Sequence, residues 1–143
     1  MPAFWDASAV LPLCVRAQAS NRARKLLAAH DPVIWWGCPV EVASALARLH
    51  REHILSVSAY QATMQKLAAM LASWRQVLPD DQVRETALRQ LERFPLKAAD
   101  AMHLAAALVW SRHNPRGRLF VCNDASLGSA ASASGFEVVA CRT

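Results

Sequence analysis

Short apolar runs alternate along the chain with longer segments in which apolar residues recur at helical spacing. The runs are rich in β-branched and aromatic residues, and they predict short buried strands over Ala3–Trp5, Val33–Trp36, Trp74–Leu78, Leu119–Cys122 and Phe136–Ala140. Periodicity, capping residues and proline breaks predict helices over Ser8 to about Arg16, Asn21–His30, Val40 to about His53, a cap at Ser56 or Ser58 to about Ser73, Val83–Phe94, Ala98–Arg112 and Ser126–Ser134. Pro12 is compatible with the first helix only near its start, because proline lacks the N–H of an interior helical position.

Strands that alternate with helices in this way predict an α/β fold with a short, mainly parallel central sheet of about four or five strands flanked by helices. The 143 residues suit one domain, residues 1–143. Four glycines are few for a β-barrel or sandwich, which needs many turns. A parallel α/β sheet binds ligands outside the carboxyl ends of its strands, so functional residues are expected there.

Composition narrows the expected environment and partners. Hydrophobic residues make up 54% of the chain, enough for a buried core. No apolar stretch approaches the roughly 20 residues that span a bilayer, and no basic leader precedes the first apolar run, so we expect a cytoplasmic protein without membrane contact. The four cysteines lie far apart without zinc-ligand spacing, which favours reduced thiols. The net charge of +5 favours an anionic partner, nucleic acid first, although it is weak evidence by itself.

Four carboxylates occupy positions that a parallel sheet would bring to one edge. Asp6 and Asp124 each follow a predicted strand, and Glu41 and Asp100 each lie in the first turn of a predicted helix. A helix that follows a strand starts at the edge where that strand ends. We therefore expect Asp6, Glu41, Asp100 and Asp124 to converge.

Convergent carboxylates repel one another, so either some take up protons or a cation lies between them. An all-oxygen set without Cys or paired His suits Mg²⁺ or Mn²⁺ better than Zn²⁺. Such an ion polarises a phosphoryl oxygen and lowers the pKa of a bound water. The competing explanation is that Asp6 and Asp124 merely cap the helices after their strands, which accounts for one such residue more easily than for four.

Four segments in this order resemble the PIN-domain nucleases, and within them the VapC-type toxins of bacterial toxin–antitoxin pairs. The segments are Phe4–Ala9, Pro39–Leu46, Leu96–Ala107, which is the most specific, and Phe120–Asp124 followed by Gly135–Val138. The resemblance implies a three-layer PIN-like fold and metal-dependent cleavage of RNA, with Asp6, Glu41, Asp100 and Asp124 as catalytic and metal-binding acids. It also implies a cognate VapB-like antitoxin that occludes the site, and a homodimer.

The sequence departs from the family pattern beside the last acid. Cys122 stands where many relatives carry Thr or Ser, and Ala125 and Ser126 stand where many carry basic residues. These departures bear on the metal geometry and the substrate contacts at Asp124, and they remove no carboxylate.

Three polar residues near the acids have open roles. Ser8 either hydrogen-bonds Asp6 or a metal-bound water, or caps the helix that begins there. His103 lies three residues after Asp100 on the same helical face, where a packed, hydrogen-bonded residue is the simpler interpretation. Asn123 either orients Asp124 or serves the turn.

The leading hypothesis is a metal-dependent endoribonuclease toxin. The alternative is a catalytically silent PIN-like module that binds RNA or protein, which failure to bind Mn²⁺ would favour. A response-regulator-like phosphoacceptor fits less well because no acid adjoins Asp6. A haloacid-dehalogenase-type phosphatase needs an acid two residues after its first Asp, where this chain has Ser8.

Overall fold

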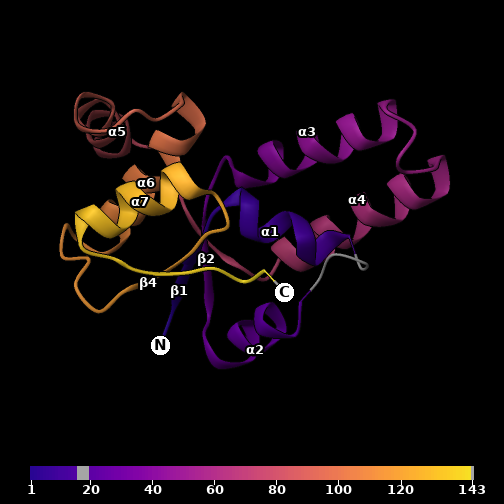
Figure 1. The fold of residues 1–143 in the computed structure, drawn as a ribbon, viewed down its shortest axis with the longest axis horizontal. Helices are drawn as coiled ribbons and strands as arrows, with labels where there is room; N and C mark the ends of the chain where they lie inside the picture. Colours follow the sequence, from indigo (N-terminus) through magenta and orange to yellow (C-terminus); the bar gives the residue numbers. More distant parts are fainter. Residues whose placement is uncertain (16–19, 143) are drawn as a thin grey trace.

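The computed structural model describes residues 1–15 and 20–142, which form a five-stranded parallel sheet between helices (Figure 1). The strands are β1 (Ala3–Trp5), β2 (Pro32–Trp35), β3 (Arg75–Val77), β4 (Leu119–Val121) and β5 (Glu137–Val139). The helices are α1 (Ala7–Cys14), α2 (Asn21–Ala29), α3 (Cys38–Arg51), α4 (Val57–Leu71), α5 (Asp81–Arg93), α6 (Ala98–Trp110) and α7 (Ala125–Ser134). The predicted α/β fold class is confirmed, and every strand pair is parallel.

The strand order places the first strand at the centre of the sheet. The order is β3-β2-β1-β4-β5, so the chain builds outward from β1 on one side and later returns to its other side. The sheet therefore reverses its winding direction between β1 and β4. Ligand sites of open α/β sheets lie at such a reversal, outside the carboxyl ends of the strands. Asp6 follows β1 and Asp124 lies three residues beyond β4, so both flank this point.

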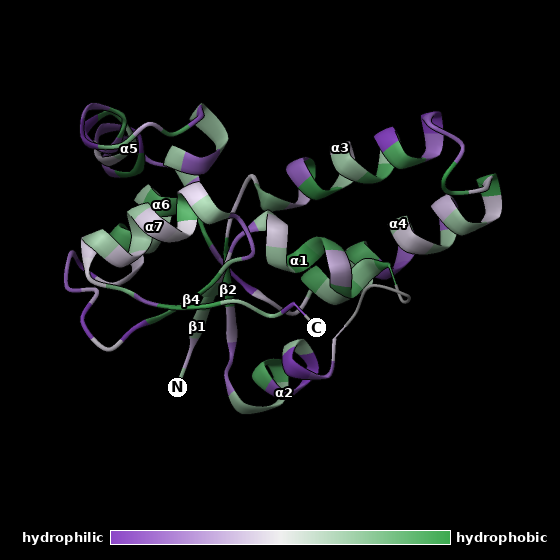
Figure 2. Ribbon diagram, in the orientation of Figure 1, coloured by the Kyte–Doolittle hydropathy of each residue, from purple (hydrophilic) through white to green (hydrophobic). Residues whose placement is uncertain are grey.

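Two separate hydrophobic clusters cover the two faces of the sheet. Alternate strand residues point to opposite faces, so Trp5 packs with α1, α3 and α4, whereas its neighbour Phe4 packs with α5, α6 and α7. Phe4 stacks on Phe120 of β4, with ring centroids 5.3 Å apart. Figure 2 shows green and purple residues interspersed along the amphipathic helix α3, in contrast to the largely green α6. Helices α1–α4 thus form one outer layer and α5–α7 the other.

Helix boundaries differ from the predicted ones where a cap or a proline sets the start. Helix α3 begins at Cys38 rather than Val40, because Pro39 fits the first turn, where its missing N–H needs no partner. Helix α5 begins at Asp81 rather than Val83, because the Asp80 side chain accepts a hydrogen bond from the Val83 amide. Of the two candidate caps for α4, Ser56 is the one that accepts the amide hydrogen bond, from Ala59.

The expectation for Pro12 is wrong. Pro12 lies well inside α1 rather than near its start, and α1 ends at Cys14; the predicted end at Arg16 falls outside the described residues. A proline at this position leaves the carbonyl four residues earlier, that of Ser8, without its helical donor. Another part of the chain supplies that donor, as shown below.

Across residues 1–15 and 20–142, no helix is both long enough and apolar enough to cross a membrane.

Candidate active site

A small cavity of about 140 Å³ lies where the sheet reverses its winding direction. All four acids singled out in the sequence line it: Asp6, Glu41, Asp100 and Asp124. Asp6 and Asp124 occupy the N-cap positions of α1 and α7, and Glu41 and Asp100 lie in the first turns of α3 and α6. The structure therefore brings the four carboxylates to one cavity, and their roles as ligands and catalytic groups stay a prediction.

Asp6 is the most deeply buried of these acids. Its relative exposure is 2%, and both carboxylate oxygens accept the Ser8 hydroxyl, at 2.8 and 2.9 Å. Asp6 occupies the N-cap position of α1, but its side chain makes no capping hydrogen bond. Burial raises the pKa of Asp6 from 3.8 to about 6, although His103 and Ser8 oppose the shift. Helix capping thus does not explain Asp6.

Asp124 does cap a helix. Its Oδ1 accepts the Leu127 amide at 2.8 Å, as the competing explanation expected. No hydrogen bond within the described part of the chain uses its other oxygen, Oδ2. Capping therefore engages one oxygen of Asp124 and leaves the second for a ligand in the cavity.

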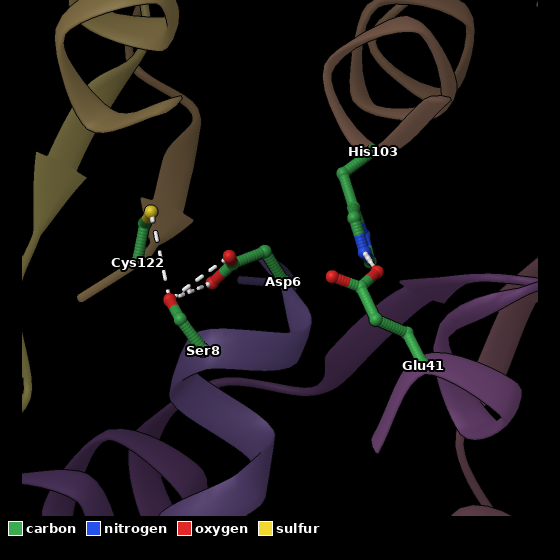
Figure 3. Close-up of polar contacts among 5 residues, drawn as sticks. All are labelled: Asp6, Ser8, Glu41, His103 and Cys122. Atoms are coloured by element: carbon green, nitrogen blue, oxygen red, sulfur yellow. Dashed lines mark hydrogen bonds and ion pairs between the residues drawn. The ribbon is translucent and has the colours of Figure 1, made fainter. Parts of the chain in front are cut away.

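Glu41 is held by a histidine from the opposite helical layer (Figure 3). His103 Nε2 of α6 lies 2.6 Å from Glu41 Oε2 of α3. The imidazole is fully buried, and its Nδ1 has no partner among the described residues. Nε2 donates this hydrogen bond, because a carboxylate oxygen can only accept. His103 thereby orients Glu41 in the cavity.

The pKa of Asp100 depends on two of the other acids in the cavity. Burial raises its pKa, and the charges of Asp124 and Glu41 raise it further, while His103 and Lys97 act in the opposite direction. The charges of Asp124 and Glu41 thus disfavour the ionised form of Asp100. A cation or a proton would relieve this repulsion.

Cys122 occupies the position where the sequence departs from the family pattern. Its thiol donates to the Asp124 carbonyl at 3.3 Å, and its Sγ lies 3.8 Å from the Ser8 hydroxyl. Burial raises the thiol pKa to about 12, so the group stays protonated at neutral pH. Figure 3 shows Ser8 between Cys122 and Asp6, so the hydroxyl next to Asp6 comes from α1.

The four carboxylates are suitable ligands for a metal ion, but their side chains are not arranged around one. Carboxylate oxygens suit a hard divalent cation, and the charges of Asp124 and Glu41 help to raise the pKa of Asp100. However, no three His, Cys, Asp or Glu side chains in the described ranges are positioned to hold one. Glu41 is bound to His103, and one oxygen of Asp124 caps α7. The carboxylates are therefore chemically suited to a cation, and binding it would require the side chains of Glu41 and Asp124 to change their orientation.

Sequence reasoning missed two features of the site. It placed His103 beside Asp100 but did not identify Glu41 as its partner. It also left Asn123 between two roles, whereas the structure joins Asn123 to Ser8 and Cys141. No sequence signal pointed to Glu41 as the partner of His103, whereas Pro12, four residues after Ser8, showed that the Ser8 carbonyl needs a donor from outside α1.

Comparisons with known proteins identify the fold. No protein-family model matches the chain, and no curated protein matches it. The chain is similar to a solved structure described as a toxin–antitoxin complex from Klebsiella pneumoniae, at 16% identity over 96% of this chain and 95% of the other, with a TM-score of 0.67. It is also similar to PAE2754 from Pyrobaculum aerophilum, at 21% identity over 97% and 90% of the chains and a TM-score of 0.68. FitAcB from Neisseria gonorrhoeae is similar at 17% identity over 94% and 96%, with a TM-score of 0.71. Likeness at these identities establishes a shared fold.

Proposed function

We propose that this protein is a metal-dependent endoribonuclease toxin of the PIN-domain, VapC type, neutralised by a cognate antitoxin. One observation carries the proposal: four carboxylates from distant segments line a single cavity where the sheet reverses its winding direction. The family resemblance assigns catalysis to the same four residues. The shared fold with a chain described as part of a toxin–antitoxin complex supports the same class of protein.

The proposed chemistry is hydrolysis of an RNA phosphodiester. Asp6, Asp100 and Asp124 would hold Mg²⁺ or Mn²⁺, which when bound activates a water and polarises the phosphoryl group. Ser8 keeps the Asp6 carboxylate in place, and His103 keeps Glu41 directed into the cavity, where it would hold or orient water. Charge placement and orientation account for the catalysis, without a covalent intermediate on the protein.

The proposal includes two protein partners. A cavity of about 350 Å³ with an almost wholly apolar lining lies between α3 and α4, and it starts at Pro39 and Val40, next to Glu41. An antitoxin segment seated there would lie beside the acids and could occlude them. The proposed homodimer would cover other exposed apolar side chains. Analytical ultracentrifugation of the purified protein tests the homodimer directly.

Cleavage of a labelled RNA pool by the purified protein tests the proposed activity. We expect cleavage in 10 mM MnCl₂, none in excess EDTA, and a loss of at least about a hundredfold in Asp6→Asn and Asp100→Asn. Asp81→Asn is the matched control, because Asp81 is exposed and pairs only with Arg84 among the described residues. Cleavage by Asp6→Asn at the wild-type rate, or full activity in EDTA, would refute the mechanism.

Growth of the host provides the second test. Induction of the wild type should arrest growth, and induction of Asp100→Asn should not. Co-expression of a small protein encoded beside the toxin should restore growth. Equal toxicity of the two forms would separate the arrest from the acidic cavity.

A second candidate function is a silent PIN-like module that binds RNA or protein. The observation that favours it is the absence, in the part of the chain described, of three ligating side chains positioned for a metal. Calorimetric titration with MnCl₂ distinguishes the two. Binding that Asp100→Asn abolishes supports the nuclease, and no binding at millimolar metal supports the silent module.

A further inference from the structure

Asn123 connects three separate segments of the chain through its side chain and backbone. Its Nδ2 donates to the Ser8 carbonyl at 3.2 Å, and its Oδ1 accepts the Cys141 amide at 2.9 Å. Its backbone amide donates to the Ser8 hydroxyl at 2.9 Å, and its carbonyl accepts the Arg142 guanidinium. Asn123, which follows β4, thus joins the start of α1 to the segment that follows β5.

The contact with the Ser8 carbonyl satisfies an acceptor that the sequence leaves without a helical donor. In an uninterrupted helix, the amide of residue 12 would donate to the carbonyl of residue 8. Residue 12 is a proline, which has no amide hydrogen, so α1 cannot satisfy this carbonyl itself. The side-chain amide of Asn123 supplies the missing donor from 115 residues away.

The same contacts reach the most buried acid of the cavity. The Ser8 hydroxyl oxygen accepts a hydrogen bond from the backbone amide of Asn123. The single hydroxyl proton of Ser8 is therefore free to donate to the Asp6 carboxylate. The resulting chain runs from Asn123 through Ser8 to Asp6. Movement of Asn123 would therefore shift the first turn of α1 and the carboxylate held by that turn.

We propose that Asn123 is a positioning residue for Asp6. Its side-chain amide joins the first turn of α1 to the segment after β5, and this connection fixes the place of the Asp6 carboxylate. An amide is required because Nδ2 must donate to Ser8 while Oδ1 accepts from Cys141. A carboxylate has no donor for Ser8, and alanine has neither group. The effect on catalysis rests on the proposed nuclease function, whereas the coupling between Asn123 and Pro12 does not.

A double-mutant cycle in thermal melts tests the coupling. Asn123→Ala removes the side-chain hydrogen bonds to Ser8 and Cys141 and leaves the Ser8 carbonyl unpaired, so we expect Tm to fall by roughly 4–8 °C. In a Pro12→Ala background, the new amide can donate to that carbonyl, and the fall should be about half as large. Asn21→Ala is the control, because Asn21 is exposed and bonds Arg24 at the surface; its Tm should change by less than about 2 °C. Equal falls in both backgrounds would overturn the proposed coupling.

RNA cleavage well below Tm tests the positioning of Asp6. We expect Asn123→Ala and Asn123→Asp to lower kcat about tenfold with KM changed less than twofold, because geometry rather than substrate contact is lost. Pro12→Ala combined with Asn123→Ala should recover part of kcat. Unchanged kcat in Asn123→Ala, or no recovery in the combined variant, would show that Asn123 has a purely structural role.

Amide hydrogen exchange keeps this test independent of the proposed nuclease activity. The Ala9 and Val10 amides donate to the Asp6 carbonyl and report on the first turn of α1. We expect both to exchange at least about tenfold faster in Asn123→Ala, and closer to wild type once Pro12→Ala is added. Wild type that cleaves no RNA would refute the nuclease, whereas unchanged exchange in Asn123→Ala would refute the positioning role.

Discussion

Neutralising Asp6 should stabilise the metal-free protein, because the fold buries this carboxyl in a place that disfavours its charge. Burial raises its pKa from 3.8 to about 6. A difference of about 2 units corresponds to about 3 kcal/mol at neutral pH, at 1.36 kcal/mol per unit. The substituted side-chain amide can still accept the Ser8 hydroxyl but must find a partner for its own N–H, which reduces the gain. We expect Asp6→Asn to increase the free energy of unfolding by about 1–3 kcal/mol, or Tm by roughly 3–9 °C.

The stability difference between Asp6→Asn and wild type should depend on pH. The folded protein binds the Asp6 proton more tightly than the unfolded chain, so wild-type stability decreases as pH rises from about 4 to about 6. The loss is complete above that range. The advantage of Asp6→Asn should therefore be small near pH 4, grow across the window and stay constant above about pH 7.

Urea denaturation of both proteins at pH 4.5, 6 and 7.5 without metal measures this difference. Asp81→Asn is the control, because its side chain is 85% exposed and should follow wild type at every pH. A difference between Asp6→Asn and wild type that does not vary with pH would refute the reasoning. So would an Asp6→Asn protein that is less stable than wild type at pH 7.5.

Three further predictions concern metal, orientation and capping. With Mn²⁺ at ten times its dissociation constant, wild type should gain RT ln 11, about 1.4 kcal/mol or roughly 3–6 °C in Tm, and Asp100→Asn much less; equal shifts in thermal melts would contradict a shared cation. His103→Leu should lower RNA cleavage about tenfold by releasing Glu41, while Tm falls by less than about 4 °C because the buried Nδ1 had no partner among the described residues; unchanged cleavage would contradict the orienting role. Ser56→Ala should reduce the free energy of unfolding by about 1 kcal/mol in urea titrations, and no change would mean that the cap contributes nothing.

Local pattern was enough to predict the elements of the fold. Strands such as Ala3–Trp5 are short, apolar and fully buried, and helices such as Ala98–Trp110 have clear propensity and a proline stop, so neighbouring residues specify them. Strand order was not predicted, because it depends on which helices pack together. Boundaries shifted where a single side chain decides the first turn, as Asp80 does for α5.

The four acids could be located for a topological reason. Each follows a strand or opens a helix, and a parallel sheet gathers those positions at one edge. Their partners could not be predicted in the same way. The contact of His103 with Glu41 spans 62 residues and two helical layers, and it depends on side-chain packing that no periodicity encodes. The Ser8–Asn123 contact likewise requires β1 and β4 to be neighbours first.

The central place of β1 affects when the site can exist during protein synthesis. Strands β1, β2 and β3 and the first four helices are made first, and Asp100, β4 and Asp124 leave the ribosome only after them. Domains fold as units while the chain emerges, and contacts between distant segments form last. A nascent chain thus carries Asp6 and Glu41 beside an open sheet edge, without their two partners. The carboxylate cavity closes only after the chain has been translated beyond Asp124.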